Sequence, residues 1–262
     1  PSQRIGEADW VGLKNYATLL QDESFRESFF VTIKFAFAVV VLEMIIGVGL
    51  ALLLDRNIRG MSMLRTIFIL PMMIAPIVVG LMWRYMYHPT VGVFNQTLKS
   101  WGFESIPWLS DSWWSLVSII IADIWQWTPF IFILALAALQ SLPRSALEAA
   151  RIDGASAWHQ IIYIKLPLMM PVLIVTALLR LIDAFKVLEV ILVMTNGGPG
   201  LSTEIMSLRI ARTASEFREL GVAAAMSNFL LILLLVLTVG MFIYNKVQEN
   251  RTMRIRQAAE EA

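Results

Sequence analysis

Ionisable side chains interrupt one of the long apolar runs of this 262-residue chain. The run at 168–194 contains Arg180, Asp183, Lys186 and Glu189, each three residues from the next. On a helix this spacing places every charge beside an opposite one, so we expect Arg–Asp, Asp–Lys and Lys–Glu neighbours. A charge at the centre of a bilayer costs about 3 kcal/mol or more, so these side chains must face protein or water. They predict either an ionic contact between helices or the lining of a translocation path, with Asp183 or Lys186 facing the solute.

The apolar run at 113–140 contains a second polar group, in which aromatic and hydrogen-bonding side chains share about one helical turn. Its members are Asp123, Trp125, Gln126 and Trp127. Proteins bind sugars through aromatic faces that stack on C–H groups and through amides and carboxylates that bond to hydroxyls. This group is therefore a candidate solute contact, together with Asn228 in the last apolar run. The alternative is that the tryptophans belong to the aromatic belt of the membrane surface and the polar side chains make a buried contact.

Residues 143–167 form a polar and mixed segment between two apolar runs. Ala, Leu, Glu and Arg favour a short helix over 145–152, which is entered through a proline. Gly154 supplies a residue that is free to adopt a left-handed turn. Ser156 then starts a second short helix, up to the proline that re-enters the membrane. The pattern predicts a helix–turn–helix along the membrane face, a shape suited to docking into a cleft of another protein.

Motifs for catalysis are missing from the sequence, which has no phosphate-binding loop, HExxH zinc motif or Gly-x-Ser-x-Gly elbow. The chain also has no cysteine, which excludes disulfides, thiolate nucleophiles and cysteine-ligated metals. A histidine metal site is not expected, because His88 and His159 fall on opposite sides of the membrane in the topology below. A net charge of +1 argues against nucleic acid as a partner. We therefore expect a chain that is not an enzyme and binds no cofactor or metal, so that a partner or a coupled ion must supply energy for uphill transport.

Composition places the chain in a membrane. Hydrophobic residues make up 58% of it and charged residues 16%, whereas soluble domains have roughly 45–50% and about 25%. Five apolar runs are about 20 residues or longer, which predicts an all-α polytopic membrane protein. The expected spans are 29–54, 66–87, 113–140, 168–194 and 222–244. Pro71 and Pro76 should kink the second span. One membrane domain over 28–247 suffices, between an N-terminal segment at 1–27 and a tail at 248–262.

Short loops predict the orientation. The loops at 55–65 and 143–167 fall on the same side as the C-terminal tail, and this side is rich in Lys and Arg. On the other side, residues 88–113 contain a single lysine. The positive-inside rule therefore places the first group in the cytoplasm and residues 1–27 outside. Residues 201–220, also outside, predict a surface helix that carries arginines.

The segment at 143–167 resembles the EAA loop of ABC-importer permeases, whose pattern is Glu-Ala-Ala, three residues, Gly, nine residues and then Ile-x-Leu-Pro. The matching residues are Glu148, Ala149, Ala150, Gly154, Ile164, Leu166 and Pro167. Resemblance extends to residues 10–16, the Arg-Asn-x-Arg-Gly loop at 56–60, the Leu-Pro at 70–71 and the Gly-Gly-Pro turn at 197–199. The chain is thus similar to the permease subunit of a bacterial carbohydrate-type ABC importer, of the maltose and glycerol-phosphate uptake class.

This resemblance implies a multi-pass subunit of a heteromeric complex in the plasma (inner) membrane, in contact with lipid. Its partners would be a second homologous permease, two ATP-binding-cassette ATPase subunits that use ATP and Mg, an extracytoplasmic solute-binding protein and a sugar-like solute. The residues implied in ATPase coupling are Glu148, Ala149, Ala150, Asp153, Gly154 and Ala155. Glu148 would pair with a basic residue of the ATPase, and Gly154 would form the turn that seats the loop, with this loop and the C-terminus in the cytoplasm.

The implied fold is that of a type I ABC importer permease with six spans, so we expect one further span before residue 1. Counting back from a cytoplasmic EAA loop leads to the same expectation, because it leaves the polar segment at 1–27 outside. The alternative function is an ion-coupled secondary transporter or a channel subunit, in which the charges of 168–194 form an ion relay. That alternative leaves the EAA match unexplained, and it predicts transport driven by an ion gradient.

Overall fold

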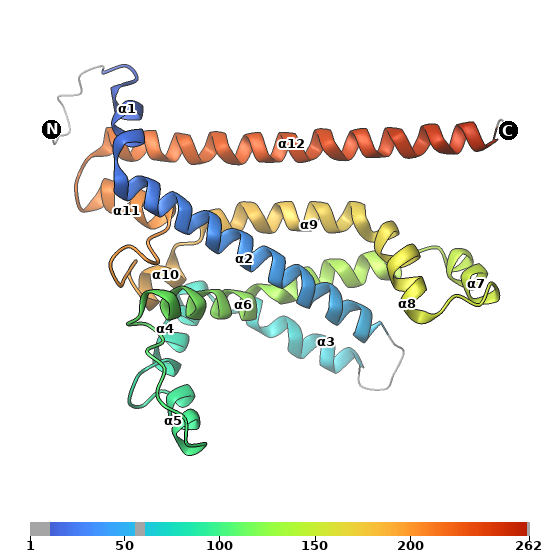
Figure 1. Ribbon diagram of the computed structural model, residues 1–262, viewed down its shortest axis with the longest axis horizontal. Helices are drawn as coiled ribbons and strands as arrows, with labels where there is room; N and C mark the ends of the chain where they lie inside the picture. The colour runs from blue at the N-terminus through green and yellow to red at the C-terminus, as the bar shows by residue number, and fades with distance from the viewer. Residues whose placement is uncertain (1–10, 56–60, 261–262) are drawn as a thin grey trace.

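The computed structural model of the chain describes residues 11–55 and 61–260, and within these ranges it contains helices and no strand (Figure 1). Trp10 and the loop at 56–60, on which part of the family resemblance rests, lie outside the described residues. The elements are α1 (Lys14–Gln21), α2 (Glu23–Leu54), α3 (Met61–Ile69), η1 (Leu70–Met73), α4 (Pro76–Met86), α5 (Val93–Ser100), α6 (Ser112–Gln140), α7 (Arg144–Ile152), α8 (Ala157–Gln160), η2 (Ile161–Lys165), α9 (Leu166–Lys186), α10 (Glu189–Met194), α11 (Met206–Ser215) and α12 (Leu220–Glu260).

Four helical stretches are long and apolar enough to cross a membrane: Glu23–Leu54, Ser112–Gln140, Ala157–Lys186 and Leu220–Ile243. A fifth is formed by α3 and α4 if this bent pair counts as one span. The predicted all-α polytopic fold is therefore confirmed. The first spanning helix, α2, begins six residues before the expected span, because the Asp22 carboxylate accepts a hydrogen bond from the Ser24 backbone N–H at 2.9 Å and caps it.

The centre of the fold is the contact of α2 with α6, against which α9 also packs. Phe35, Val39 and Ile119 are fully buried there. Gly47 permits the close approach of the two helices, because a Cβ atom at this position would lie 2.8 Å from Ile131 Cγ2 and 3.1 Å from the Phe132 backbone nitrogen. Small residues serve this purpose in membranes, where van der Waals packing drives helix association.

The second span is bent more sharply than a kink. Pro71 lies in the 3₁₀ turn η1 and Pro76 is the first residue of α4, and the two halves of the span form an angle of 99°. This break leaves backbone groups without helical partners, which is costly away from water. The Gln126 side-chain amide of α6 donates to the Ile74 carbonyl at 3.0 Å and satisfies one of them.

The fourth span is also broken, which corrects the expected single helix over 168–194. α9 ends at Lys186, Val187 is extended with φ −55 and ψ 135, and α10 begins at Glu189. The Ser207 hydroxyl donates to the Val187 carbonyl and satisfies a group that the break frees.

The halves beyond the two breaks pack on each other, since α10 contacts α4. Gly80 makes this contact close, because a Cβ there would lie 3.2 Å from Val190 Cα. Arg84 Nη1 also donates to the Val193 carbonyl at 2.9 Å. The two discontinuous spans are thus one packed unit at this end of the bundle.

Loops gather at the two ends of the bundle as the topology requires. Figure 1 shows α7, α8, the C-terminal end of α2 and the C-terminus at one end, and α1, α4, α5, α10 and α11 at the other. This grouping agrees with the two sets of loops expected from the sequence.

The surface helix expected within 201–220 is instead packed against the bundle. It appears as α11, which contacts α2, α9 and α12. Arg209 and Arg212 are only 14% and 20% exposed, and both bind the buried Glu204 carboxylate. The Arg209 guanidinium also binds Asp22 at 2.9 Å. Arg209 therefore fixes the junction of α1 and α2 to α11.

The α2–α6 contact predicts a difference between two glycines of one helix. Gly47→Ala should destabilise the protein by about 1–3 kcal/mol through overpacking, partly offset by about 0.5–1 kcal/mol of helix propensity. Gly49→Ala is the matched control, because a Cβ there meets nothing within 4 Å. Thermal unfolding of the purified variants in detergent measures both. Equal stability of the two would show that Gly47 does not set the helix distance.

Candidate functional site

The loop between α6 and α9 folds into the predicted helix–turn–helix. The turn after α7 has two cross-bonds, from the Ala155 N–H to the Ala150 carbonyl at 2.9 Å and from the Gly154 N–H to the Arg151 carbonyl at 3.1 Å. With Gly154 at φ +77, this is the Schellman arrangement that ends helices at a left-handed residue. A Cβ at Gly154 would meet nothing within 4 Å, so glycine is favoured here by the backbone angle and not by space.

The second helix of the loop runs further than expected. The Ser156 hydroxyl caps α8 by accepting from the His159 N–H at 3.3 Å, and the Gln160 side-chain amide holds the turn through the Ala155 carbonyl at 2.9 Å. Instead of ending near residue 163, the helix passes through the π-helical turn η2 into α9. The stretch Ala157–Lys186 is one candidate span of 30 residues.

Large apolar side chains are exposed on this loop. Ile152 is 86% exposed and Trp158 is 72% exposed, and Tyr163 is exposed beside them. Of the residues expected to couple to an ATPase, Ala150 is buried and Ala155 half-buried, whereas Glu148, Ala149, Asp153 and Gly154 are exposed. Within the described part of the chain, no ion pair involves Glu148. Exposed apolar surface rimmed by polar residues marks a protein interaction site.

Charged residues from three helices meet inside the bundle. Arg180 of α9 binds the Glu43 carboxylate of α2 through Nε at 2.7 Å and Nη2 at 2.9 Å, and Nη2 also donates to Asp123 of α6. All three side chains are at most 1% exposed. The Arg180 guanidinium carbon also lies 5.4 Å from the ring centroid of Trp127. This Arg180 cluster joins the three central helices.

The spacing of the charges along the fourth run predicted two of the contacts in this region and missed the strongest. Arg180 lies 3.7 Å from Asp183, and Lys186 lies 4.0 Å from Asp183, as expected. The expected Lys186–Glu189 contact is wrong: the break at Val187 puts the two residues on different helices, and no ion pair between them is present in the described part of the chain. In the sequence, Glu43 is a single carboxylate within an apolar run. Such a residue indicates that a polar partner exists, but it does not identify that partner.

The remaining candidate solute contacts do not gather at one place. The Gln126 side-chain amide donates a hydrogen bond to the Ile74 carbonyl. The Trp125 ring packs edge-on against the Trp83 ring, with 5.8 Å between the ring centroids. Asn228 lies apart, with its side-chain amide donating to the Tyr16 hydroxyl of α1 at 3.3 Å. Asp183 and Lys186, in contrast, are partly exposed next to the break between α9 and α10.

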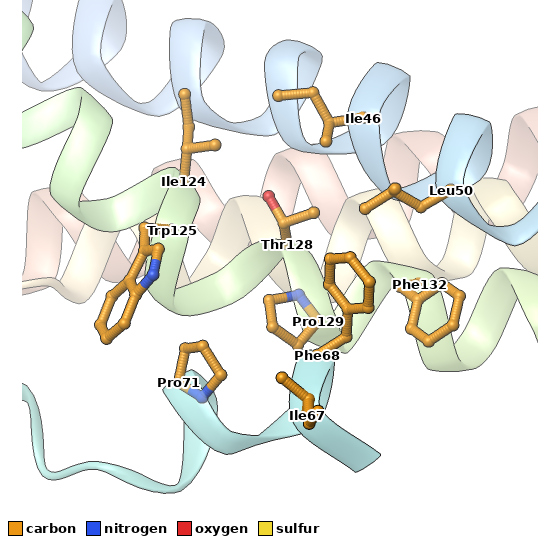
Figure 2. A pocket seen from close by; sticks show the side chains of 10 residues that line it. All are labelled: Ile46, Leu50, Ile67, Phe68, Pro71, Ile124, Trp125, Thr128, Pro129 and Phe132. Atoms are coloured by element: carbon orange, nitrogen blue, oxygen red, sulfur yellow. The ribbon is translucent and has the colours of Figure 1, made fainter. Parts of the chain in front are cut away.

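A cavity of about 350 Å³ lies between α2, α6 and the α3–η1 arm, and Figure 2 shows the side chains that line it. It is lined by Ile46, Leu50, Ile67, Phe68, Pro71, Ile124, Trp125, Thr128, Pro129 and Phe132. Thr128 is the one residue of this lining that has a hydroxyl group, and the buried oxygen of that hydroxyl has no hydrogen-bond partner. A sugar needs several polar partners for its hydroxyls, so this cavity does not have the chemistry of a sugar site.

Removal of the guanidinium from the Arg180 cluster should be strongly destabilising. Arg180→Met leaves two buried carboxyl groups without their cation, which costs about 3–5 kcal/mol. The triple variant Glu43→Leu/Asp123→Leu/Arg180→Met removes the charges together and should recover most of the loss. The yield of folded protein and its thermal unfolding in detergent measure the effect, with the exposed Lys186→Met as control. Wild-type stability of Arg180→Met would refute the structural importance of the cluster.

Two known transport permeases are similar to this chain in sequence. The trehalose/maltose transport system permease protein MalF of Thermococcus litoralis is 40% identical over 93% of this chain and 81% of its own length. The sn-glycerol-3-phosphate transport system permease protein UgpA of Shigella flexneri is 33% identical over 90% of this chain and 80% of its own length.

Two crystal structures of a bacterial alginate ABC transporter match the fold. One, of the transporter that imports the acidic polysaccharide alginate, has a TM-score of 0.84 and 25% identity over 92% of this chain and 85% of the matched chain. The other, in complex with an alginate pentasaccharide-bound periplasmic protein, has a TM-score of 0.81 over 88% and 81%. Residues 43–254, which include the α7–α8 loop and the Arg180 cluster, match the family described as binding-protein-dependent transport system inner membrane component. The chain is therefore a member of the binding-protein-dependent transport system inner membrane component family.

Proposed function

We propose that this chain is one of two permease subunits of an ATP-driven importer and forms half of the translocation path for a sugar or a related polar solute. The family supports transport that depends on a binding protein. Relatives named for trehalose/maltose and sn-glycerol-3-phosphate transport support a sugar-like solute, as does the alginate importer of the same fold.

The observation that carries the proposal is the α7–α8 loop. Its turn is fixed by cross-bonds at Gly154, and its exposed Ile152 and Trp158 have the character of a docking surface. We assign its partner as an ATPase subunit, to which Glu148 contributes a carboxylate for a basic residue. ATP and Mg would be bound by that partner, on the cytoplasmic side of the cell membrane, and this side would also hold the C-terminus of the chain.

The helix geometry supports a mechanism for coupling. A continuous helix of 30 residues, Ala157–Lys186, is about 45 Å long. It connects the docking loop directly to Arg180 and to the break at Val187. When ATP draws the docked loops of the two permeases together, this helix transmits the movement to the polar groups at the far side. The path then changes from inward-facing to outward-facing.

The remaining partners fit surfaces that the chain leaves open. In the most apolar windows of the spans that include α9 and α12, only 17% and 22% of residues are buried, so large apolar faces remain for the second permease and for lipid. An extracytoplasmic solute-binding protein would deliver the solute at the end opposite α7, as the periplasmic protein of the alginate transporter supports. We keep as candidate solute contacts Asp123, Trp125, Gln126, Trp127, Asp183, Lys186 and Asn228.

The energy source separates this proposal from an ion-coupled transporter or a channel. In proteoliposomes that contain the assembled transporter and its binding protein, solute uptake should require ATP on the α7 side. It should persist when ionophores collapse the proton and sodium gradients. Uptake that stops with the ionophores and continues without ATP would refute the proposal, and it would favour an ion relay through the fourth-run charges.

The coupling loop should be sensitive to its turn and its carboxylate. Gly154→Val forces a β-branched residue to φ +77, at a local cost of about 1–3 kcal/mol, and Glu148→Ala removes the charge for the partner. Both should lower ATPase binding and solute uptake severalfold. Gly154→Asn is the matched control, because asparagine tolerates left-handed angles, and it should retain most activity. Co-purification with the ATPase and uptake assays measure both steps. Normal coupling in Gly154→Val and Glu148→Ala would remove the loop from the mechanism.

A further inference from the structure

Residues 88–111 connect α4 to α6 at the end of the bundle opposite the coupling loop. Figure 1 shows α5, the helix of this segment, extending sideways from the bundle on the side away from α12, across the direction of the long helices. A helix in this position lies parallel to the membrane plane. The segment has no role in the proposed coupling or solute path.

The base of this projection is fixed to the bundle. Asn95 is 1% exposed: its Oδ1 accepts from the Ile106 N–H at 3.0 Å and from Trp108 Nε1 at 3.1 Å, and its amide donates to the Ile106 carbonyl at 3.1 Å. The centroid of the Phe94 ring lies 5.8 Å from that of Trp83 in α4 and 5.0 Å from that of Tyr87, the residue that follows α4. The orientation of α5 is therefore set by contacts and not by a flexible connection.

The outer surface of the projection is divided into an apolar and a polar side. Trp101 is 71% exposed and Phe103 is 61% exposed, and Val93 is also exposed. At 100° per residue, Trp101, which directly follows α5, points about 140° away from Gln96 and about 160° away from Lys99, and both of these polar residues are exposed. A short amphipathic helix with aromatic residues on one side and lysine on the other suits a membrane surface.

The ends of the segment fix its depth. It leaves α4 at Met86 and enters α6 at Ser112, so both ends are at the end of an apolar span. Trp113 is exposed at the start of α6, in the position that interfacial tryptophans occupy. An apolar side with two large aromatic rings at this level contacts the boundary between headgroups and acyl chains. Lys99 can extend along this boundary and keep its ammonium group in water.

We propose that α5 and the residues after it are an interfacial anchor, in which Trp101 and Phe103 insert into the leaflet on the side opposite the coupling loop. The partner is the lipid surface itself. The anchor would hold the end of α4, and with it the packed α4–α10 unit, at a fixed depth in the membrane. The inference does not depend on the energy source or on the solute.

The absence of cysteine from the chain makes a direct depth measurement possible. Single cysteines at Trp101, Phe103, Gln96 and Lys99 would carry spin labels in the full-length transporter, reconstituted in nanodiscs of phosphatidylcholine and phosphatidylglycerol. The ratio of collisions with oxygen to collisions with a water-soluble nickel chelate should be severalfold higher at 101 and 103 than at the matched positions 96 and 99. Equal ratios at all four positions would show a surface in water. Protection of 101 and 103 from both reagents would show a covering protein. Either result overturns the proposal.

A second measurement needs no label on the apolar side. Brominated acyl chains quench tryptophan at the boundary, so replacing normal lipids by brominated ones should quench less of the total fluorescence in Trp101→Phe than in the unsubstituted chain. An unchanged quenched fraction would place Trp101 away from the acyl chains and contradict the anchor.

Discussion

The contact of Arg180 with Glu43 and Asp123 is the constraint on which the arrangement of the central helices depends. Each residue lies in an apolar helix, and none of the three can be left alone in a hydrocarbon environment. Their positions on α9, α2 and α6 fix how the three helices are rotated about their axes, because only one rotation of each brings the charges together. Apolar packing alone would allow other rotations of these helices. The close contact at Gly47 also limits the distance between α2 and α6. The orientation of the long helix Ala157–Lys186, which starts in the α7–α8 loop, follows from this cluster.

The two broken spans show how the chain tolerates exposed backbone groups within apolar segments. At each break a carbonyl loses its helical partner, and a side chain from a distant part of the sequence replaces it: Gln126 for Ile74 and Ser207 for Val187. This gives Gln126 a structural role, although its place between two tryptophans had suggested a solute contact. Asp183 and Lys186, which are both partly exposed, lie directly before the break at Val187.

The sequence predicted what depends on local chemistry and on the period of the apolar runs. The spans, the bend at Pro71 and Pro76 and the turn at Gly154 follow from residue type, because proline lacks an N–H and glycine accepts a positive φ. The partner of Arg180 could not be predicted, because Glu43 is 137 residues away and helix spacing describes only local neighbours. The break at Val187 was missed for the same reason: no proline or glycine marks it, and it is stabilised by the contact of α10 with α4 and by Ser207. Likewise, Arg209 and Arg212 were assigned to a surface because Glu204 and Asp22 approach them only in the folded chain.

The side chains that complete the two breaks also impose an order on biogenesis. A ribosome delivers the chain from its N-terminus, so Ile74 emerges long before Gln126, and Val187 emerges before Ser207. Glu43 likewise emerges before Asp123, and both emerge before Arg180. Until those later residues arrive, the freed carbonyls and the unpaired carboxylates need water or another polar environment. The first spans therefore gain their last polar partners only after α9 and α11 have been made, and these contacts are completed late in synthesis.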